Sequence, residues 1–174
     1  WNLSGVPVLP GINVIEVRFM GENDQVVRSQ KVEVWYDDGS VAAVSGTLPV
    51  DDTVWAPASG PYRITGTVTV PVGGTLQILP GTTLYFAQDA SLLINGRLLA
   101  EGTEASRIRM TREPGTLTTW SGVRLNNSTQ DNRLTYADLA FASANDAVRI
   151  DNSQLLIDHV TWTDTTSTII DMSN

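Results

Sequence analysis

Several residue types and patterns are missing from this chain of 174 residues, and each absence excludes a class of protein. There is no cysteine, which excludes disulfides and thiolate metal sites. Lys31 is the only lysine and the formal net charge is −8, which argues against nucleic-acid binding because phosphate contacts need a basic face. No apolar run is long enough to span a membrane, and no signal peptide is recognisable.

Helical periodicity is also missing, because no window of 11 residues carries a convincing apolar stripe. Threonine and valine are abundant instead, and 14 glycines and 8 prolines interrupt the chain. Threonine and valine favour strands, whereas glycine and proline favour the turns between them. The composition therefore predicts an all-β protein.

Residues 1–38 predict a β-hairpin from alternating apolar and polar positions. A turn at 9–13 leads into a strand at 14–19, a polar turn follows at 21–24, and a second strand covers 26–36. The Leu-Pro-Gly-Ile-Asn turn and this hairpin resemble the closing strands of an immunoglobulin-like or fibronectin-like sandwich. A lone hairpin is only marginally stable, so we expect it to pack on further strands or on the next domain.

A different pattern begins near residue 61, after a segment at 39–60 that we predict to be a linker and a cap. Short apolar-x-apolar triplets recur between turns, and the later part contains an internal repeat. Residues 134–141 align with 155–162 at an offset of 21, and 123–128 align with 148–153 at an offset of 25. Such a period fits one turn of a parallel β-helix.

Four segments carry a resemblance to a known superfamily: 62–70, 74–82, 92–102 and 120–123. They resemble the opening turns of secreted right-handed β-helix proteins, relatives of the pectin-lyase-like superfamily found in large bacterial surface proteins. The resemblance implies a right-handed parallel β-helix of about five rungs over 61–174, and a secreted, extracellular location. It does not fix the function, because that superfamily includes lyases, hydrolases, adhesins and spacers.

The two ends of the β-helix need partners, because successive rungs stack through the backbone at about 4.8 Å. The segment 39–60 is the candidate cover for the first rung, whereas the last rung near Asn174 has none. Because Trp1 begins within one pattern and the final residues lie in another, we expect a piece of a longer or processed protein. Expected partners are further rungs, other surface-protein domains or copies of the chain itself.

An arginine row is the candidate ligand site. Arg124 and Arg149 occupy the same position of the repeat and point outward on adjacent rungs, and Arg109 would extend the row. Like charges stacked this closely repel unless something lies between them. One reading is a site for an anion or an acidic glycan, and the other is neutralisation by a local carboxylate such as Asp151 or Asp138.

Two further sets of residues are interpreted as structural. Asn127 and Asn152 share a repeat position after a strand and predict a hydrogen-bonded ladder. The tryptophans could form a sugar-stacking platform, but a role in the core or cap is favoured because aromatic side chains dominate core energetics. They are Trp1, Trp35, Trp55, Trp120 and Trp162.

No catalytic constellation is recognisable in the sequence. Glycoside hydrolysis needs two facing carboxylates, and we find no convergent pair with a matching base near His159, the only histidine. Two acidic pairs in loops, Asp37-Asp38 and Asp51-Asp52, could bind Ca²⁺ weakly, although solvated loop acids are the favoured reading. We therefore expect no enzyme and no cofactor.

Two functions follow from these expectations. The first is an extracellular structural or interaction module, such as a stalk, adhesin or matrix segment, with an extracellular filament subunit as a variant. The second is a carbohydrate-binding or carbohydrate-active module that acts on polysaccharide.

Overall fold

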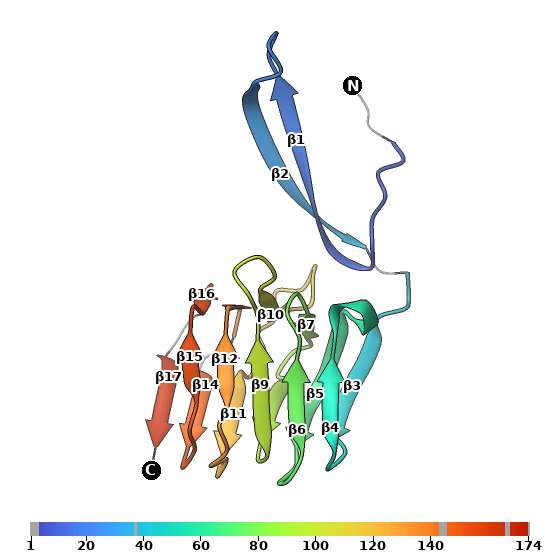
Figure 1. Cartoon of the computed structure of the whole chain (residues 1–174). Helices are drawn as coiled ribbons and strands as arrows, with labels where there is room; N and C mark the ends of the chain where they lie inside the picture. The colour runs from blue at the N-terminus through green and yellow to red at the C-terminus, as the bar shows by residue number, and fades with distance from the viewer. Residues whose placement is uncertain (1–3, 37, 143–145, 166–167, 174) are drawn as a thin grey trace. The chain divides into compact units, whose positions relative to one another are not determined.

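The computed structural model describes residues 4–36, 38–142, 146–165 and 168–173 of the chain. The chain divides into two compact units, Trp1–Val41 and Ala42–Asn174 (Figure 1). Apart from one short 3-10 helix, η1 (Pro57–Ser59), the described elements are strands. The predicted all-β class is therefore confirmed.

The first unit contains an antiparallel hairpin formed by β1 (Gly11–Met20) and β2 (Val26–Tyr36). Ile15 lies opposite Val32 in this pairing, so apolar side chains share one side of the hairpin. The turn before β1 is closed by Asn13, whose Oδ1 accepts from the Leu9 N–H at 2.9 Å while its Nδ2 donates to the Leu9 carbonyl at 2.7 Å. The hairpin predicted from alternation is confirmed.

The second unit is a parallel β-solenoid of about five turns, as the sequence predicts. Its strands stack on three faces. Face A consists of the first halves of β3 (Ala42–Thr47) and β5 (Tyr62–Val70), followed by β7 (Thr83–Phe86), β10 (Ile108–Arg112), β13 (Ala137–Ala140) and β16 (Thr161–Thr163). Face B consists of the second halves of β3 and β5, followed by β8 (Ser91–Ile94), β11 (Val123–Asn126), β14 (Asp146–Asp151) and β17 (Thr168–Ser173). Face C consists of β4 (Asp52–Trp55), β6 (Thr75–Ile78), β9 (Arg97–Glu101), β12 (Arg133–Thr135) and β15 (Leu156–Asp158).

The segment 39–60, expected to be a linker and cap, contains two strands of the solenoid. β3 pairs with β5, and β4 pairs with β6, so these strands cover the edges of the next turn. Val44 and Leu48 pack against the core, and Trp55 is buried in it. The period-2 pattern is weak in the sequence here because small residues occupy alternate positions of β3.

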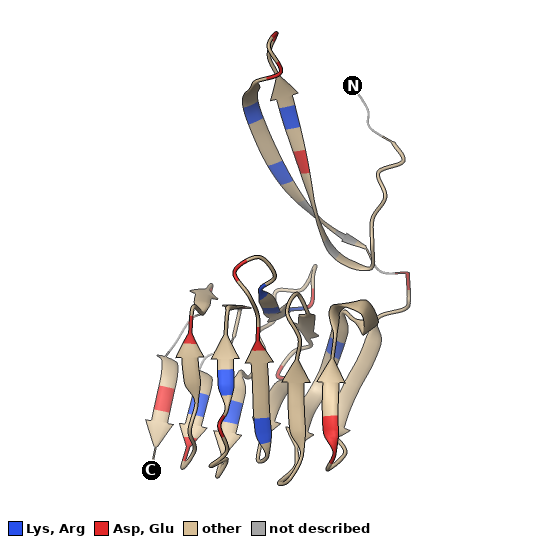
Figure 2. Ribbon diagram, viewed as in Figure 1, with Lys and Arg blue, Asp and Glu red and all other residues tan. Residues whose placement is uncertain are grey.

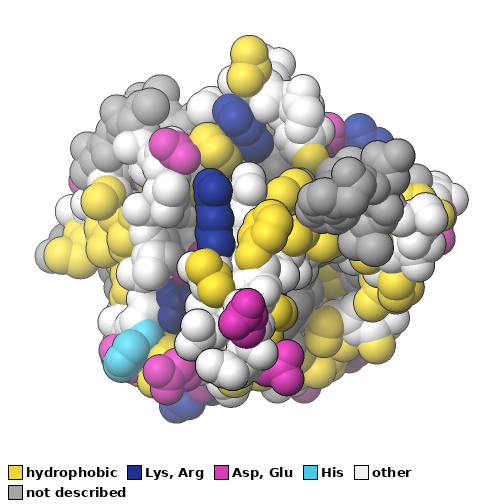
Figure 3. All heavy atoms as spheres, turned by 90° about the horizontal axis from the view of Figure 1, so that it is seen from above, with side chains coloured by type: hydrophobic (Ala, Val, Ile, Leu, Met, Phe, Trp, Pro, Cys, Tyr) yellow, Lys and Arg dark blue, Asp and Glu magenta, His cyan; other side chains and the backbone are white. Residues whose placement is uncertain are grey.

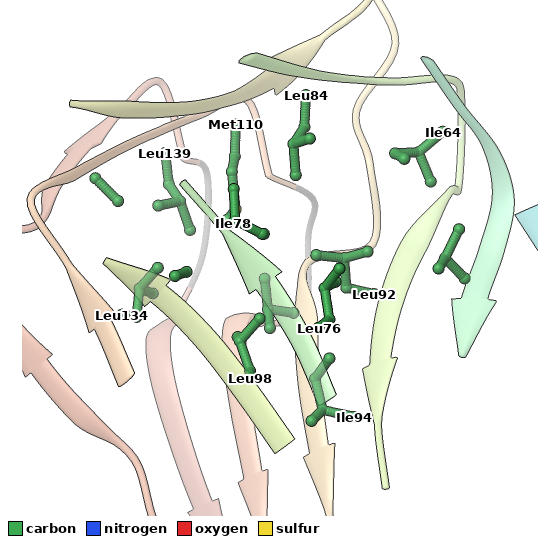
Figure 4. Packing of buried hydrophobic residues seen from close by; sticks show 14 of the residues in the cluster. Ile64, Leu76, Ile78, Leu84, Leu92, Ile94, Leu98, Met110, Leu134 and Leu139 are labelled. Atoms are coloured by element: carbon green, nitrogen blue, oxygen red, sulfur yellow. The ribbon is translucent and has the colours of Figure 1, made fainter. Parts of the chain in front are cut away.

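The core is built from columns of side chains that repeat from turn to turn. Leu84, Met110 and Leu139 occupy successive turns of face A and are buried (Figure 4). They point into the same interior as Ile78 and Leu98 of face C. Each apolar-x-apolar triplet contributes two side chains to the core. Burial of one such side chain stabilises the fold by roughly 1.5–3 kcal/mol.

Three of the tryptophans lie in or against this core, as favoured from the sequence. Trp120 is fully buried, stacks on Phe86 at 4.0 Å between ring centroids, and donates from Nε1 to the Ala140 carbonyl at 2.8 Å. Trp55 is buried beside Tyr62, and Trp162 is half-buried against the core. Trp1 and the side chain of Trp35 lie outside the described part of the chain.

Candidate functional site

Arg124 and Arg149 lie next to each other on face B. They are paired residues of the adjacent strands β11 and β14, where Figure 2 shows basic positions. The flanking Val123 and Val148 are buried, so alternation directs the arginines outward. The repeat offset of 25 residues therefore predicts their register correctly.

One member of this arginine pair, Arg149, forms an ion pair with a carboxylate. Arg149 Nε donates to Asp151 Oδ2 at 2.8 Å and to Oδ1 at 3.0 Å, and Asp171 of β17 is in register with Arg149. The Ser173 hydroxyl donates to Asp151, and this bond together with Arg149 holds the pKa of Asp151 below its usual value. Asp151 in turn raises the pKa of Arg149. This ion pair is the arrangement expected if local carboxylates compensate the arginines.

Arg109 does not extend the row. It lies on β10 of face A, in register with Thr83 and Asp138, whereas Arg124 lies beyond the corner on face B. The connection 113–122 carries the chain around that corner, so closeness in sequence does not place the two arginines on one face. The predicted row of three is therefore corrected to a pair.

A neighbouring arginine that the sequence reasoning missed makes the larger network on face A. Arg107 Nε donates to Asp138 Oδ1 at 2.7 Å. Its Nη2 donates to the carbonyls of Ala137 at 3.0 Å and His159 at 2.7 Å. Because Arg107 precedes the triplet that begins at Ile108, the triplet pattern gives no signal for it.

The asparagine ladder lies along the corner between faces B and C. Asn152 Nδ2 donates to Asn127 Oδ1 at 2.8 Å, and Asn127 Nδ2 donates to Asn126 Oδ1 at 3.0 Å. Asn126 Nδ2 then donates to Asn95 Oδ1 at 3.1 Å. Asn127 and Asn152 have φ of 53° and 44°, the left-handed conformation that asparagine tolerates at a tight bend.

A further asparagine, Asn132, is buried near this corner, although the sequence patterns do not single it out. Its Oδ1 accepts from the Leu98 N–H at 2.8 Å. Its Nδ2 donates to Ser128 Oγ at 2.8 Å, to the Gln154 carbonyl at 2.9 Å and to the Gln130 carbonyl at 3.0 Å. One side chain thus links three consecutive turns.

Ion pairs also cross face C. Arg133 contacts Asp131 at 2.7 Å and Glu101 at 3.0 Å, and Arg133 holds the pKa of Asp131 below its usual value. Beside them lies a hollow of about 150 Å³. It is lined by Gly73, Gly74, Thr75, Gly96, Arg97 and Gln130. Ligand pockets usually enclose about 300–1,000 Å³, so this hollow is small for an organic ligand.

His159 and Asp138, two acid–base groups considered in the sequence, each contact neighbouring side chains. His159 stacks on Tyr136 at 4.4 Å between centroids, and its Nδ1 lies 2.8 Å from Asp158 Oδ1 at the exposed corner. Asp138 is held by Arg107 and by the Thr161 hydroxyl.

Of the two acidic loop pairs considered for Ca²⁺, the structure describes Asp38, Asp51 and Asp52. Among the residues that the structure describes, no group of three or more His, Asp or Glu side chains is placed to hold a metal ion. Asp51 and Asp52 are exposed, as is Asp38, which accepts from the Ser40 N–H at 2.9 Å. Asp37 lies outside the described residues.

The open end of the solenoid, defined here as β15, β16 and β17, exposes apolar side chains that inner turns bury. Among the described strands, each of these three pairs with one neighbour, which lies in the preceding turn (Figure 1). Ile170 is in register with the buried Val148 but is 38% exposed, and Met172 is in register with Ile150 but is 75% exposed. These two positions therefore continue the inward columns of the core, although no described strand covers them.

The chain matches no protein-family model, no curated protein and no solved structure. In the part of the chain that the structure describes, no helix has the length and apolar character needed to cross a membrane. Acidic and basic side chains are interspersed on the face shown in Figure 3.

Proposed function

We propose that this chain is a structural and interaction module of an extracellular surface protein, serving as a stalk, adhesin or matrix segment. The parallel solenoid carries the proposal, because its stacked turns present three regular faces and the pairing of strands joins each turn to the next.

The side-chain networks along the faces support a structural role. Arg107, Arg133 and Arg149 are each bound to carboxylates of the same chain, and Asn132 satisfies its polar atoms inside the core. The contacts of Arg107, Arg133 and Asn132 join neighbouring turns, whereas the pair of Arg149 and Asp151 lies within β14.

The extracellular location and the wider architecture rest on the sequence resemblance. The right-handed, pectin-lyase-like coil and the immunoglobulin-like origin of the hairpin belong to this proposal. The acidic composition and the absence of cysteine are compatible with a secreted protein that is stabilised without cross-links.

Surface exposure on the source cells tests the proposal. We expect brief protease treatment of intact cells to release peptides of this chain, because an extracellular module is accessible before lysis. Mass spectrometry of the released peptides gives the result, with an abundant cytoplasmic protein as the control for leakage. Detection of the chain only after lysis would contradict the extracellular function.

Polysaccharide binding is the second candidate, favoured by polar side chains that line one edge of face B. Arg124, Asn126, Asn127 and Asn152 are all exposed there. If an acidic polysaccharide binds this edge, the Arg124→Ala, Arg149→Ala double variant should bind it about tenfold or more weakly, since a charge-assisted hydrogen bond contributes about 1.5–3 kcal/mol.

Binding of labelled acidic and neutral polysaccharides to the wild type and the variant measures this effect. Arg28→Ala, in the hairpin, is the matched control and should bind like the wild type. Equal binding by the double variant, or no binding of any polysaccharide to the wild type, would remove this candidate.

A further inference from the structure

We infer that Asn127 is a site of N-linked glycosylation, at which a glycan is attached to the corner between faces B and C. The inference rests on the proposed extracellular function, because this modification is made at surface loops of secreted chains. It adds a covalently bound sugar to the side of the solenoid.

The acceptor motif, Asn-x-Ser or Asn-x-Thr, occurs twice in overlapping copies where β11 leads into β12. One copy joins Asn126 to the hydroxyl of Ser128, and the other joins Asn127 to the hydroxyl of Thr129. β11 and β12 each pair with strands on both sides, so this connection lies in an inner turn of the solenoid.

The structure favours the second copy, because of the two motif hydroxyls only that of Thr129 is accessible. Ser128 is buried, and its hydroxyl donates to the Gly96 carbonyl and accepts from Asn132 Nδ2 at 2.8 Å. Thr129 is exposed, as is Asn127 itself. The complete motif at Asn127 therefore presents both of its functional groups at the surface.

Asn127 can carry a glycan while the asparagine ladder stays intact. Its amide nitrogen has two hydrogens, one of which is donated to Asn126 Oδ1 at 3.0 Å. Its Oδ1 accepts from Asn152 Nδ2 at 2.8 Å. Replacement of the second hydrogen by a sugar leaves one N–H and the carbonyl oxygen, which are the two groups that the ladder uses.

The reaction joins Asn127 Nδ2 to the anomeric carbon of a sugar that is donated as a glycosyl diphosphate by a transferase of the source cell. The N–C bond forms as the bond between the anomeric carbon and the phosphate oxygen breaks. The diphosphate leaves with the electron pair of the broken bond, and the amide nitrogen gives one proton to a base of the transferase.

Asn152 is a matched control within the same chain. It occupies the equivalent position of the repeat, is exposed, and has a φ of 44°, close to the 53° of Asn127. The second residue after it is Gln154, so the acceptor motif is missing there. We expect Asn127 to be modified and Asn152 to be unmodified.

Mass spectrometry of the chain purified from its source tests the inference. Cleavage after arginine separates the two asparagines into peptides that begin at Leu125 and Ile150. The first peptide should carry the mass of a glycan. Peptide-N-glycosidase should then convert Asn127, and not Asn126, to aspartate, which marks the modified position.

Three variants produced in the source cells test the role of the motif. Thr129→Ala should abolish the modification, whereas Thr129→Ser should keep it, because serine also supplies the hydroxyl. Gln154→Thr completes the motif at Asn152 and should add a second glycan there. Thr129 and Gln154 are exposed, and circular dichroism verifies that each variant is folded.

Three results would overturn the inference. They are an unmodified Asn127 in a chain that protease releases from intact cells, a glycan on Asn126 in place of Asn127, and a modification that persists in Thr129→Ala. The first result would leave the proposed function standing. A chain that is detected only after lysis would contradict the proposed function and this inference together.

Discussion

Gly96→Ala is expected to destabilise the solenoid by more than about 3 kcal/mol, because overpacking costs about 1–3 kcal/mol and ladder hydrogen bonds would be lost as well. A Cβ at this position would lie 2.2 Å from the Pro71 carbonyl oxygen and 2.3 Å from the Gly74 carbonyl oxygen. Both obstacles are backbone atoms of the preceding turn. The Gly74 carbonyl also accepts from the Arg97 N–H at 2.9 Å, so relief of the clash would strain the stack.

Thermal and denaturant unfolding of the variant measure the loss. A destabilisation of 1 kcal/mol shifts Tm by about 2–4 °C in a domain of this size, so Gly96→Ala should lower Tm by about 6 °C or more. Gly66→Ala is the matched control, because its Cβ would meet only Ser45 Cβ, at 3.8 Å. Gly66→Ala should change stability by less than about 1 kcal/mol. Equal losses in the two variants would show that the close approach at Gly96 is unimportant.

The short-range patterns of the sequence predict the solenoid well. Each turn buries alternate residues of short strands, and this local alternation identifies triplets such as 92–94 and 108–110. The offset of 25 residues pairs Arg124 with Arg149, because β11 and β14 follow equivalent corners. Repetition of one turn thus carries register information that a single strand lacks.

Features that depend on corners and on long-range contacts are not visible in the same patterns. The face assigned to Arg109 depends on how far the connection 113–122 reaches around a corner, and its composition does not specify that path. The sequence predicts a linker where β3 lies, because the inward positions of β3 include Ala42 and Gly46, which give little apolar signal. The residues with which they pair, Tyr62 and Val68 of β5, lie 20 or more residues away in the sequence.

The sequence patterns do not reveal the structural role of Asn132, because its position in the repeat is apolar in other turns. Leu76 and Leu98 occupy the equivalent inward positions of face C. A polar residue at that position therefore indicates, from the sequence alone, that the apolar-x-apolar pattern has ended. In the structure Asn132 replaces an apolar contact with hydrogen bonds to Leu98 and Gln154 in the two adjacent turns. A polar residue inside an otherwise apolar column is the signal that could have revealed it.

Asn132→Leu is expected to cost about 2–5 kcal/mol, although leucine suits the apolar column. The substitution removes the acceptor of the Leu98 N–H and the donor to the Gln154 carbonyl, and each buried unsatisfied group costs about 1–3 kcal/mol. Denaturant unfolding measures the loss. Asn126→Ala, which removes an exposed hydrogen bond to Asn95, should cost less than about 1 kcal/mol. A Leu variant as stable as this control would show that Asn132 does not link the turns.

Asn132→Asp separates hydrogen bonding from side-chain shape. The introduced carboxyl still accepts from the Leu98 N–H, but when ionised it cannot donate to the carbonyls of Gln154 and Gln130. Burial and these carbonyls favour the protonated form, so the pKa of the carboxyl should be higher in the folded than in the unfolded chain. The loss of stability in Asn132→Asp should therefore be smallest below about pH 4 and grow as the pH rises through the folded-state pKa.

The loss of stability in Asn132→Leu should not change in this way, because leucine does not titrate. Denaturant unfolding of both variants at several pH values makes the comparison. Equal pH dependence in both variants would mean that the donor bonds to the neighbouring carbonyls do not stabilise the solenoid.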